Sequence, residues 1–152
     1  LVMENEIRHE VRGDTEYLQK LPSEDKGSIN DMEDSTSEFE DKRIIFLMPY
    51  GGRNELVKAS NDSNPFNRST NDTDVSETGE DEQGFRESLL LGDLADVDLM
   101  VRTSEIRISN FMLYHNAYSE FVFFNKNWPS FTQTDFYESI YKYQNRERRF
   151  GV

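Results

Sequence analysis

The segments Asp98-Leu-Met-Val-Arg102 and Glu120-Phe-Val-Phe-Phe124 decide the fold. Each is a short apolar run without strict alternation, which is typical of a strand that is buried on both faces. Between them, residues 109–118 are predicted to form a helix with Ser109 as its N-cap. Strand, helix and strand in this order predict two parallel strands joined by a crossover connection.

The same pattern extends toward both ends of the chain. Residues 7–11 and 43–50 are predicted strands, and the second is apolar on both faces, as in the centre of a sheet. The predicted helices cover residues 29–38, 83–91 and 134–149. In the last of these, Phe136, Ile140 and Tyr143 share one face. The sequence therefore predicts an α/β protein with a mainly parallel central sheet flanked by helices and incomplete at its N-terminus.

Residues 60–84 have a different composition, rich in Ser, Asn, Asp, Thr and Glu, with Phe66 and Val75 as their strongly apolar residues. Such a segment buries too little apolar surface to offset the entropy of ordering it. We predict a flexible or disordered insert at 60–84 within one domain that covers residues 1–152.

Charge is distributed unevenly along the 152 residues, whose formal net charge is -13. Residues 1–100 carry 25 acidic and 10 basic side chains, whereas residues 101–152 carry 5 acidic and 7 basic ones. An acidic chain is a poor partner for nucleic acid or for an anionic membrane surface. We therefore expect an anionic ligand to bind in the C-terminal third.

Cysteine is absent, which excludes disulfides, thiol nucleophiles and thiolate metal sites and fits a reducing compartment. No apolar run approaches the ~20 residues that span a bilayer. Leu1–Ile7 lacks the basic and apolar regions of a signal peptide. These features predict a cytoplasmic protein.

The clearest binding pattern is Arg102-Thr-Ser-Glu-Ile-Arg107-Ile-Ser109. Arg102 ends a predicted strand, which is where open α/β sheets bind ligands, and Arg107 follows on the loop. Two guanidiniums, a hydroxyl and the N–H groups of a helix start suit one anion with many oxygens, such as a diphosphate. Two surface arginines and a capping serine would have the same spacing, so the residues alone leave both interpretations open.

Glu120 is a candidate ligand for Mg²⁺, because an ion bound to substrate phosphates needs only one or two protein carboxylates. An exposed residue at the start of a strand is the simpler interpretation of the same position. His9 and His115 stand isolated in the sequence, and we expect a structural role for His115 rather than a catalytic one.

Taken together, the motifs resemble those of the cis-prenyltransferases, which are the undecaprenyl and polyprenyl diphosphate synthases. The resemblance rests on Gly13-Asp14, Tyr50-Gly-Gly-Arg-Asn-Glu55, Asp98-Leu-Met-Val-Arg-Thr103, Arg107-Ile-Ser-Asn-Phe111, Ala117-Tyr-Ser-Glu120, Trp128-Pro-Ser-Phe131 and Arg146-Glu-Arg-Arg-Phe-Gly151. It covers nearly the whole chain outside residues 60–84 and is most specific after residue 93.

The resemblance implies a transferase that condenses isopentenyl diphosphate with an allylic prenyl diphosphate, with Mg²⁺, to make a Z-polyprenyl diphosphate. The substrate-binding residues that it implies are Arg102, Arg107, Ile108, Ser109 and Gly151, and the metal ligand is Glu120. The end Arg149-Phe150-Gly151 would reach the active site of a partner subunit, so a homodimer or heterodimer is implied. The lipid product implies peripheral contact with a membrane.

Three features depart from the family pattern. The N-terminal segment with the family's Asp-Gly-Asn-Gly-Arg motif is missing, so we predict a C-terminal portion that is inactive alone, with the catalytic Asp upstream of Leu1. The usual Arg-Thr-(Gly/Ser)-Gly-Glu-x-Arg motif is one residue shorter between Arg102 and Arg107, and a polar stretch replaces the helix after Arg53. The alternatives are a non-catalytic partner subunit of a heteromeric enzyme and a degenerate anion-binding α/β protein.

Overall fold

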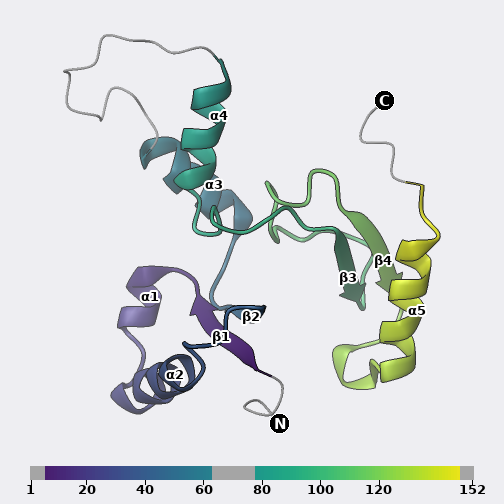
Figure 1. Ribbon diagram of the computed structural model, residues 1–152, viewed down its shortest axis with the longest axis horizontal. Helices are drawn as coiled ribbons and strands as arrows, with labels where there is room; N and C mark the ends of the chain where they lie inside the picture. The colour runs from purple at the N-terminus through teal and green to yellow at the C-terminus, as the bar shows by residue number, and fades with distance from the viewer. Residues whose placement is uncertain (1–5, 63–77, 148–152) are drawn as a thin grey trace. The chain divides into compact units, whose positions relative to one another are not determined.

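The computed structural model describes residues 6–62 and 78–147, which include strands and helices along most of the chain (Figure 1). The chain divides into two compact units, Leu1–Glu55 and Leu56–Val152. Both units combine helices with parallel strands, which confirms the predicted α/β class. Among the described residues, no helix has the length and apolar character needed to cross a membrane.

The first unit pairs β1 (Ile7–Arg12) with β2 (Lys42–Leu47) in parallel, and α1 (Thr15–Gln19) and α2 (Ser23–Ser35) connect the two strands. Asp14 caps α1, because its side chain accepts from the backbone N–H groups of Glu16 and Tyr17. Helix α2 begins earlier than predicted, directly after Pro22. Both predicted strands of this unit are confirmed.

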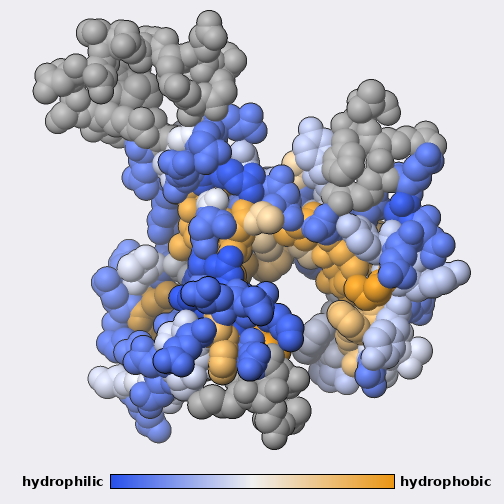
Figure 2. Space-filling model, viewed as in Figure 1, coloured by the Kyte–Doolittle hydropathy of each residue, from blue (hydrophilic) through white to orange (hydrophobic). Residues whose placement is uncertain are grey.

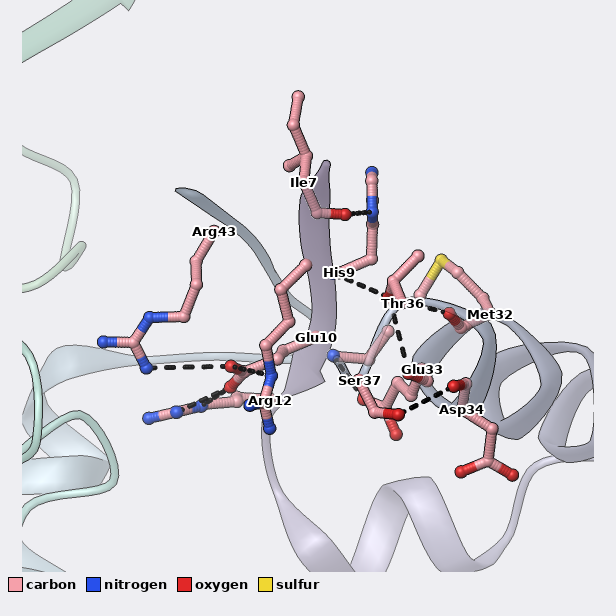
Figure 3. A network of polar contacts seen from close by, with 12 residues as sticks. Ile7, His9, Glu10, Arg12, Met32, Glu33, Asp34, Thr36, Ser37 and Arg43 are labelled. Atoms are coloured by element: carbon pink, nitrogen blue, oxygen red, sulfur yellow. Dashed lines mark hydrogen bonds and ion pairs between the residues drawn. The ribbon is translucent and has the colours of Figure 1, made fainter. Parts of the chain in front are cut away.

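Two sets of polar contacts hold β1, one through its backbone and one through the side chain of Glu10 (Figure 3). The backbone N–H of His9 donates to Thr36 Oγ1 at 3.1 Å, and that of Val11 donates to Glu33 at 2.7 Å. Side chains from the end of α2 thus satisfy backbone groups of β1 that would otherwise be unpaired. The Glu10 carboxylate forms ion pairs at 3.1, 2.6 and 3.7 Å with three arginines, namely Arg8, Arg12 and Arg43.

Strand β2 is more exposed than predicted. Ile44 and Phe46 are 40% and 42% exposed, so the expectation of a strand buried on both faces is wrong for the described residues. In the part of the chain that the structure describes, β2 pairs with β1 alone. One neighbour and one covering helix cannot bury both faces of a strand.

The second unit pairs β3 (Leu99–Thr103) with β4 (Glu120–Phe124), also in parallel, with Leu99 opposite Glu120 and Arg102 opposite Phe123. Val122 and Phe124 are buried on the face of β4 that contacts α5 (Gln133–Gln144). A 3-10 turn, η2 (Trp128–Ser130), lies before α5. Figure 2 shows apolar residues gathered around β3 and β4.

The helix predicted at residues 109–118 does not form, because bends and turns occupy this segment. Ser109, Asn110 and Met112 have φ values of 56°, 63° and 47°. These values lie in the left-handed region, which a right-handed helix excludes. Ser109 is therefore not an N-cap, and it has no row of helical N–H groups behind it.

Helices occupy both ends of the predicted insert at 60–84. A helix does follow Arg53, because α3 covers Gly52–Asp62, so the expectation that a polar stretch replaces it is wrong for these residues. Helix α4 (Thr78–Glu87) begins before the predicted start at residue 83. Residues 63–77 lie outside the described residues, so an insert in that range stays a prediction.

The predicted apolar face of α5 is confirmed in part. Ile140 and Tyr143 are half-buried, whereas Phe136 is 50% exposed. Asp135 and Ser139 are the buried residues of this helix. The Thr132 side chain and Asp135 form a reciprocal capping box, and Lys126 Nζ donates to Asp135 Oδ1 at 2.6 Å. These bonds fix the position of Asp135 in the first turn of the helix. They also lower the pKa of Asp135 to about 2, with Lys126 as the largest cause and Thr132 next.

This lowered pKa predicts a pH-dependent stability. The folded pKa lies below the ordinary value of 3.8, so the contribution of Asp135 is complete above that pH and disappears as the pH falls through about 2. We expect Asp135→Asn to lower the thermal midpoint at pH 7 and to change it little near pH 2. Thermal scans of both proteins at the two pH values test this, with Glu138→Gln on the same helix as control. A midpoint difference that is equal at both pH values would contradict the role of the carboxylate.

Candidate functional site

Arg102 lies at the C-terminal end of β3 and organises the loop that follows it. Its Nε donates to the backbone oxygen of Glu105 at 3.2 Å, and its Nη1 donates to the backbone oxygen of Ile108 at 3.3 Å. Its Nη2 contacts Glu105 Oε2 at 3.3 Å. One guanidinium thus joins the start, middle and end of the loop.

Arg107 reaches the same carboxylate oxygen as Arg102. The Nη2 of Arg107 lies 2.5 Å from Glu105 Oε2, so one anionic atom is bound by both guanidiniums. The two predicted arginines are therefore close enough to share one anion, which spacing in the sequence could not establish. Two cations around one carboxylate leave the group with a net positive charge.

Backbone strain is concentrated in and after this loop. The N–H of Glu105 donates to the backbone oxygen of Thr103 at 3.0 Å, which closes a three-residue turn around Ser104. Ser104 has a φ of 76°, as expected at the centre of the rarer and more strained kind of γ-turn. The loop that lacks one residue of the family motif closes through this tight turn.

A pocket of about 280 Å³ lies beside Arg102. Its walls are Met100, Val101, Arg102, Thr103, Ile108 and Phe111. Ile108 thus lines the pocket and also accepts from Arg102 through its backbone oxygen. Ser109 follows directly and is exposed, so its hydroxyl is near the site in sequence, but it does not line the pocket.

Glu120 is separated from the two arginines within this unit. It pairs with Leu99 at the start of the β3–β4 ladder, three residues before Arg102, which is roughly 10 Å along the strands. In the register, Glu120 shares a face with Val122 and Phe124, whereas Arg102 shares the opposite face with Phe123. The Glu120 Oε2 atom instead lies 3.6 Å from Nε of Arg146.

The described residues do not form a ready site for Mg²⁺ beside Arg102 and Arg107. Within residues 6–62 and 78–147, no group of three or more His, Cys, Asp or Glu side chains could hold a metal ion. Glu120 alone supplies one carboxylate, which faces away from Arg102. Within the ranges that the structure describes, the residues therefore do not fit an ion shared by Glu120 and an anion at the arginines.

The other predicted motifs occupy structural positions. Gly13 packs so closely against the β2 end that an added Cβ would lie 2.3 Å from the Met48 backbone oxygen. Glu55 is buried and accepts a hydrogen bond from the Tyr50 hydroxyl, which closes the Tyr-Gly-Gly-Arg turn at the start of α3. Gly13 is thus held by backbone packing, and Glu55 by a hydrogen bond within the turn.

Both histidines are buried, and both contact backbone atoms. His9 Nδ1 lies 3.0 Å from the Ile7 oxygen, and His115 Nε2 lies 3.0 Å from the Leu91 oxygen. These contacts agree with the structural role predicted for His115. Gly151 and its neighbours Arg149 and Phe150 lie outside the described residues.

Glu105 is the residue of this site that sequence reasoning missed. Its position between Arg102 and Arg107, three residues from one and two from the other, was the available signal. An acidic residue flanked by two arginines that are expected to hold an anion is itself the nearest competing anion.

A parallel β-loop-β unit with two arginines gathered at the end of one strand defines an α/β protein with a cationic loop at the edge of its sheet. The family model for undecaprenyl diphosphate synthase matches residues 1–151, and the chain belongs to this family of cis-prenyltransferases. A tritrans,polycis-undecaprenyl-diphosphate synthase (GGDP specific) from Sulfolobus acidocaldarius is 37% identical over 156 residues, covering 100% of this chain.

Solved structures show the same similarity. A probable undecaprenyl diphosphate synthase from Campylobacter jejuni matches with a TM-score of 0.74 and 28% identity, covering 99% of this chain and 66% of the other. Lavandulyl diphosphate synthase from Lavandula x intermedia, in complex with dimethylallyl diphosphate, matches with a TM-score of 0.81 and 26% identity, covering 96% and 61% of the two chains. The chain spans 56% of the length of the Sulfolobus relative.

Proposed function

We propose that this chain binds the diphosphate of isopentenyl diphosphate through Arg102 and Arg107, as part of a cis-prenyltransferase. The observation that carries the proposal is the contact of both guanidiniums with one carboxylate oxygen of Glu105. Groups that converge on a carboxylate can converge on a phosphate oxygen in the same way. The family membership supplies the substrate class.

The whole protein is proposed to transfer an allylic prenyl group to isopentenyl diphosphate, and this chain is proposed to hold one of the two substrates. Arg102 would fix the position of the diphosphate, because two backbone oxygens hold its guanidinium at the end of β3. Arg107, with a more exposed side chain, would close over the ligand. The walls of the pocket formed by Met100, Ile108 and Phe111 are apolar and would suit the short carbon chain.

The role of Glu120 stays a separate prediction. Magnesium ions favour oxygen ligands and normally retain several waters, so one carboxylate can contribute to binding. The position of Glu120 on the other face of the β3–β4 ladder means that it does not join the arginines in this chain. A homodimer or heterodimer, as the family resemblance implies, is also a proposal.

Replacing Arg107 tests the proposed site. We expect Arg107→Ala to weaken the binding of isopentenyl diphosphate by 1–3 kcal/mol, which is about the value of one charged hydrogen bond. Titration calorimetry on the 152-residue chain measures this change. The matched control is Lys142→Ala. This substitution also removes one positive charge, but Lys142 pairs with Glu138 on α5 and not with the proposed site. Equal affinity for Arg107→Ala and the parent chain would remove Arg107 from the site.

A further inference from the structure

The carboxylate of Glu105 occupies the position that a ligand shared by Arg102 and Arg107 must occupy. Its Oε2 atom lies 3.3 Å from Arg102 Nη2 and 2.5 Å from Arg107 Nη2. A phosphate oxygen placed between the same two guanidiniums would meet this carboxylate at contact distance. Like charges at that distance repel, so the carboxylate and the phosphate cannot be bound there together.

The remaining contacts of Arg102 do not depend on this carboxylate. Two of its three hydrogen bonds go to the backbone oxygens of Glu105 and Ile108. When the Glu105 side chain leaves, Arg102 keeps its place at the end of β3. The site therefore does not need Glu105 to position its first guanidinium.

The side chain of Glu105 is free to leave, because it is 47% exposed. Ion pairs between exposed side chains contribute little to stability, so a ligand with several charged oxygens can replace such a pair. The tight turn at Ser104 directs the chain back toward Arg102 and so brings Glu105 next to both arginines. This turn lies within the loop that is one residue shorter than the family motif.

We propose that Glu105 is a built-in competitor of the diphosphate, which must leave both arginines before the ligand binds and so sets the affinity of the site. This inference rests on the proposed function, because it assumes that the arginines bind a diphosphate. A pyrophosphate brings more charge and more oxygens than the carboxylate it replaces. A ligand with a single carboxylate gains nothing by the same exchange, so the competitor also selects against simple carboxylates.

Calorimetric titration with inorganic pyrophosphate tests the competition. We expect Glu105→Gln to bind pyrophosphate about 5- to 10-fold more tightly than the parent chain, because the amide keeps the shape of the side chain and loses its charge. The control is Glu138→Gln, which changes the net charge equally, and the Glu138 side chain is also 47% exposed. Binding to this control should stay within about 2-fold of the parent, which excludes a general effect of the acidic chain.

A second variant changes the loop and keeps the charge of Glu105. Insertion of one glycine between Ser104 and Glu105 restores the length of the family motif, and we expect it also to tighten pyrophosphate binding. The competitor role of Glu105 would be overturned if Glu105→Gln bound pyrophosphate no more tightly than the parent chain. The proposed function would still stand in that case, provided that the parent binds pyrophosphate and Arg107→Ala binds it less tightly. Absence of pyrophosphate binding by the parent chain and by all variants would overturn both.

Discussion

Replacing Arg102 with alanine is expected to weaken the binding of pyrophosphate by more than about 100-fold, because at least two charged hydrogen bonds of roughly 1.5–3 kcal/mol each are lost. The effect should exceed that of Arg107→Ala. Arg102 also holds the loop through the backbone oxygens of Glu105 and Ile108, so its loss removes the order of the site as well as one charge. Calorimetry with inorganic pyrophosphate measures the loss.

Arg102→Lys separates charge from geometry at the same position. A lysine keeps the positive charge but cannot present the planar, forked set of donors that bonds three acceptors at once. We expect an affinity between those of the parent chain and Arg102→Ala. Circular dichroism and urea midpoints establish that each variant is folded. Binding by folded Arg102→Ala at the parent affinity would place the anion elsewhere.

The second large effect is expected in the core of the second unit. Leu91 is completely buried, and its backbone oxygen lies 3.0 Å from His115 Nε2. Leu91→Ala removes buried methyl groups and leaves a cavity, which costs about 3 kcal/mol in comparable cores. Such a loss is a large part of the free energy of unfolding of a typical domain, which is roughly 5–15 kcal/mol. Urea unfolding followed by the fluorescence of Trp128, the one tryptophan, gives the difference.

The neighbouring residue offers a matched control. Leu90 is 39% exposed, so Leu90→Ala makes the same chemical change where less surface is buried. We expect Leu90→Ala to cost about 1 kcal/mol or less, since the removed atoms were already partly in water. Equal unfolding free energies for the two variants would contradict the burial of Leu91.

The strands were predictable because each is a short apolar run with a clear boundary. Leu99–Thr103 and Glu120–Phe124 fall within one residue of the predicted ranges, and both pair in parallel as the crossover pattern requires. The burial of β2 was not predictable in this way, because it depends on how many neighbours the strand has. Ile44 and Phe46 have the residue types of a central strand without its environment.

The failed helix at 109–118 shows a different limit. Polar contacts hold a different backbone there. Within the segment, the Asn116 side chain donates to the Phe111 oxygen at 2.9 Å. Directly after it, the Ser119 hydroxyl donates to the oxygen of Val97, which is distant in the sequence, at 2.6 Å. Asn and Ser side chains that bond to nearby backbone compete with helix formation, and the sequence pattern does not reveal which outcome prevails.

The candidate site was half predictable. The sequence placed Arg102 at a strand end and Arg107 on the loop after it, but it did not show that their guanidiniums meet. The separation of Glu120 could also have been inferred, because it begins its strand whereas Arg102 lies near the end of a parallel one. The role of Glu105 needed coordinates, since only they show that both guanidiniums meet one of its oxygen atoms.

A crystal structure of this chain with inorganic pyrophosphate tests the central claim most directly. We expect pyrophosphate oxygens in hydrogen-bond contact with the guanidiniums of both Arg102 and Arg107, and the Glu105 carboxylate turned away from them. A structure in which pyrophosphate is bound elsewhere, while Glu105 still contacts both arginines, would contradict it.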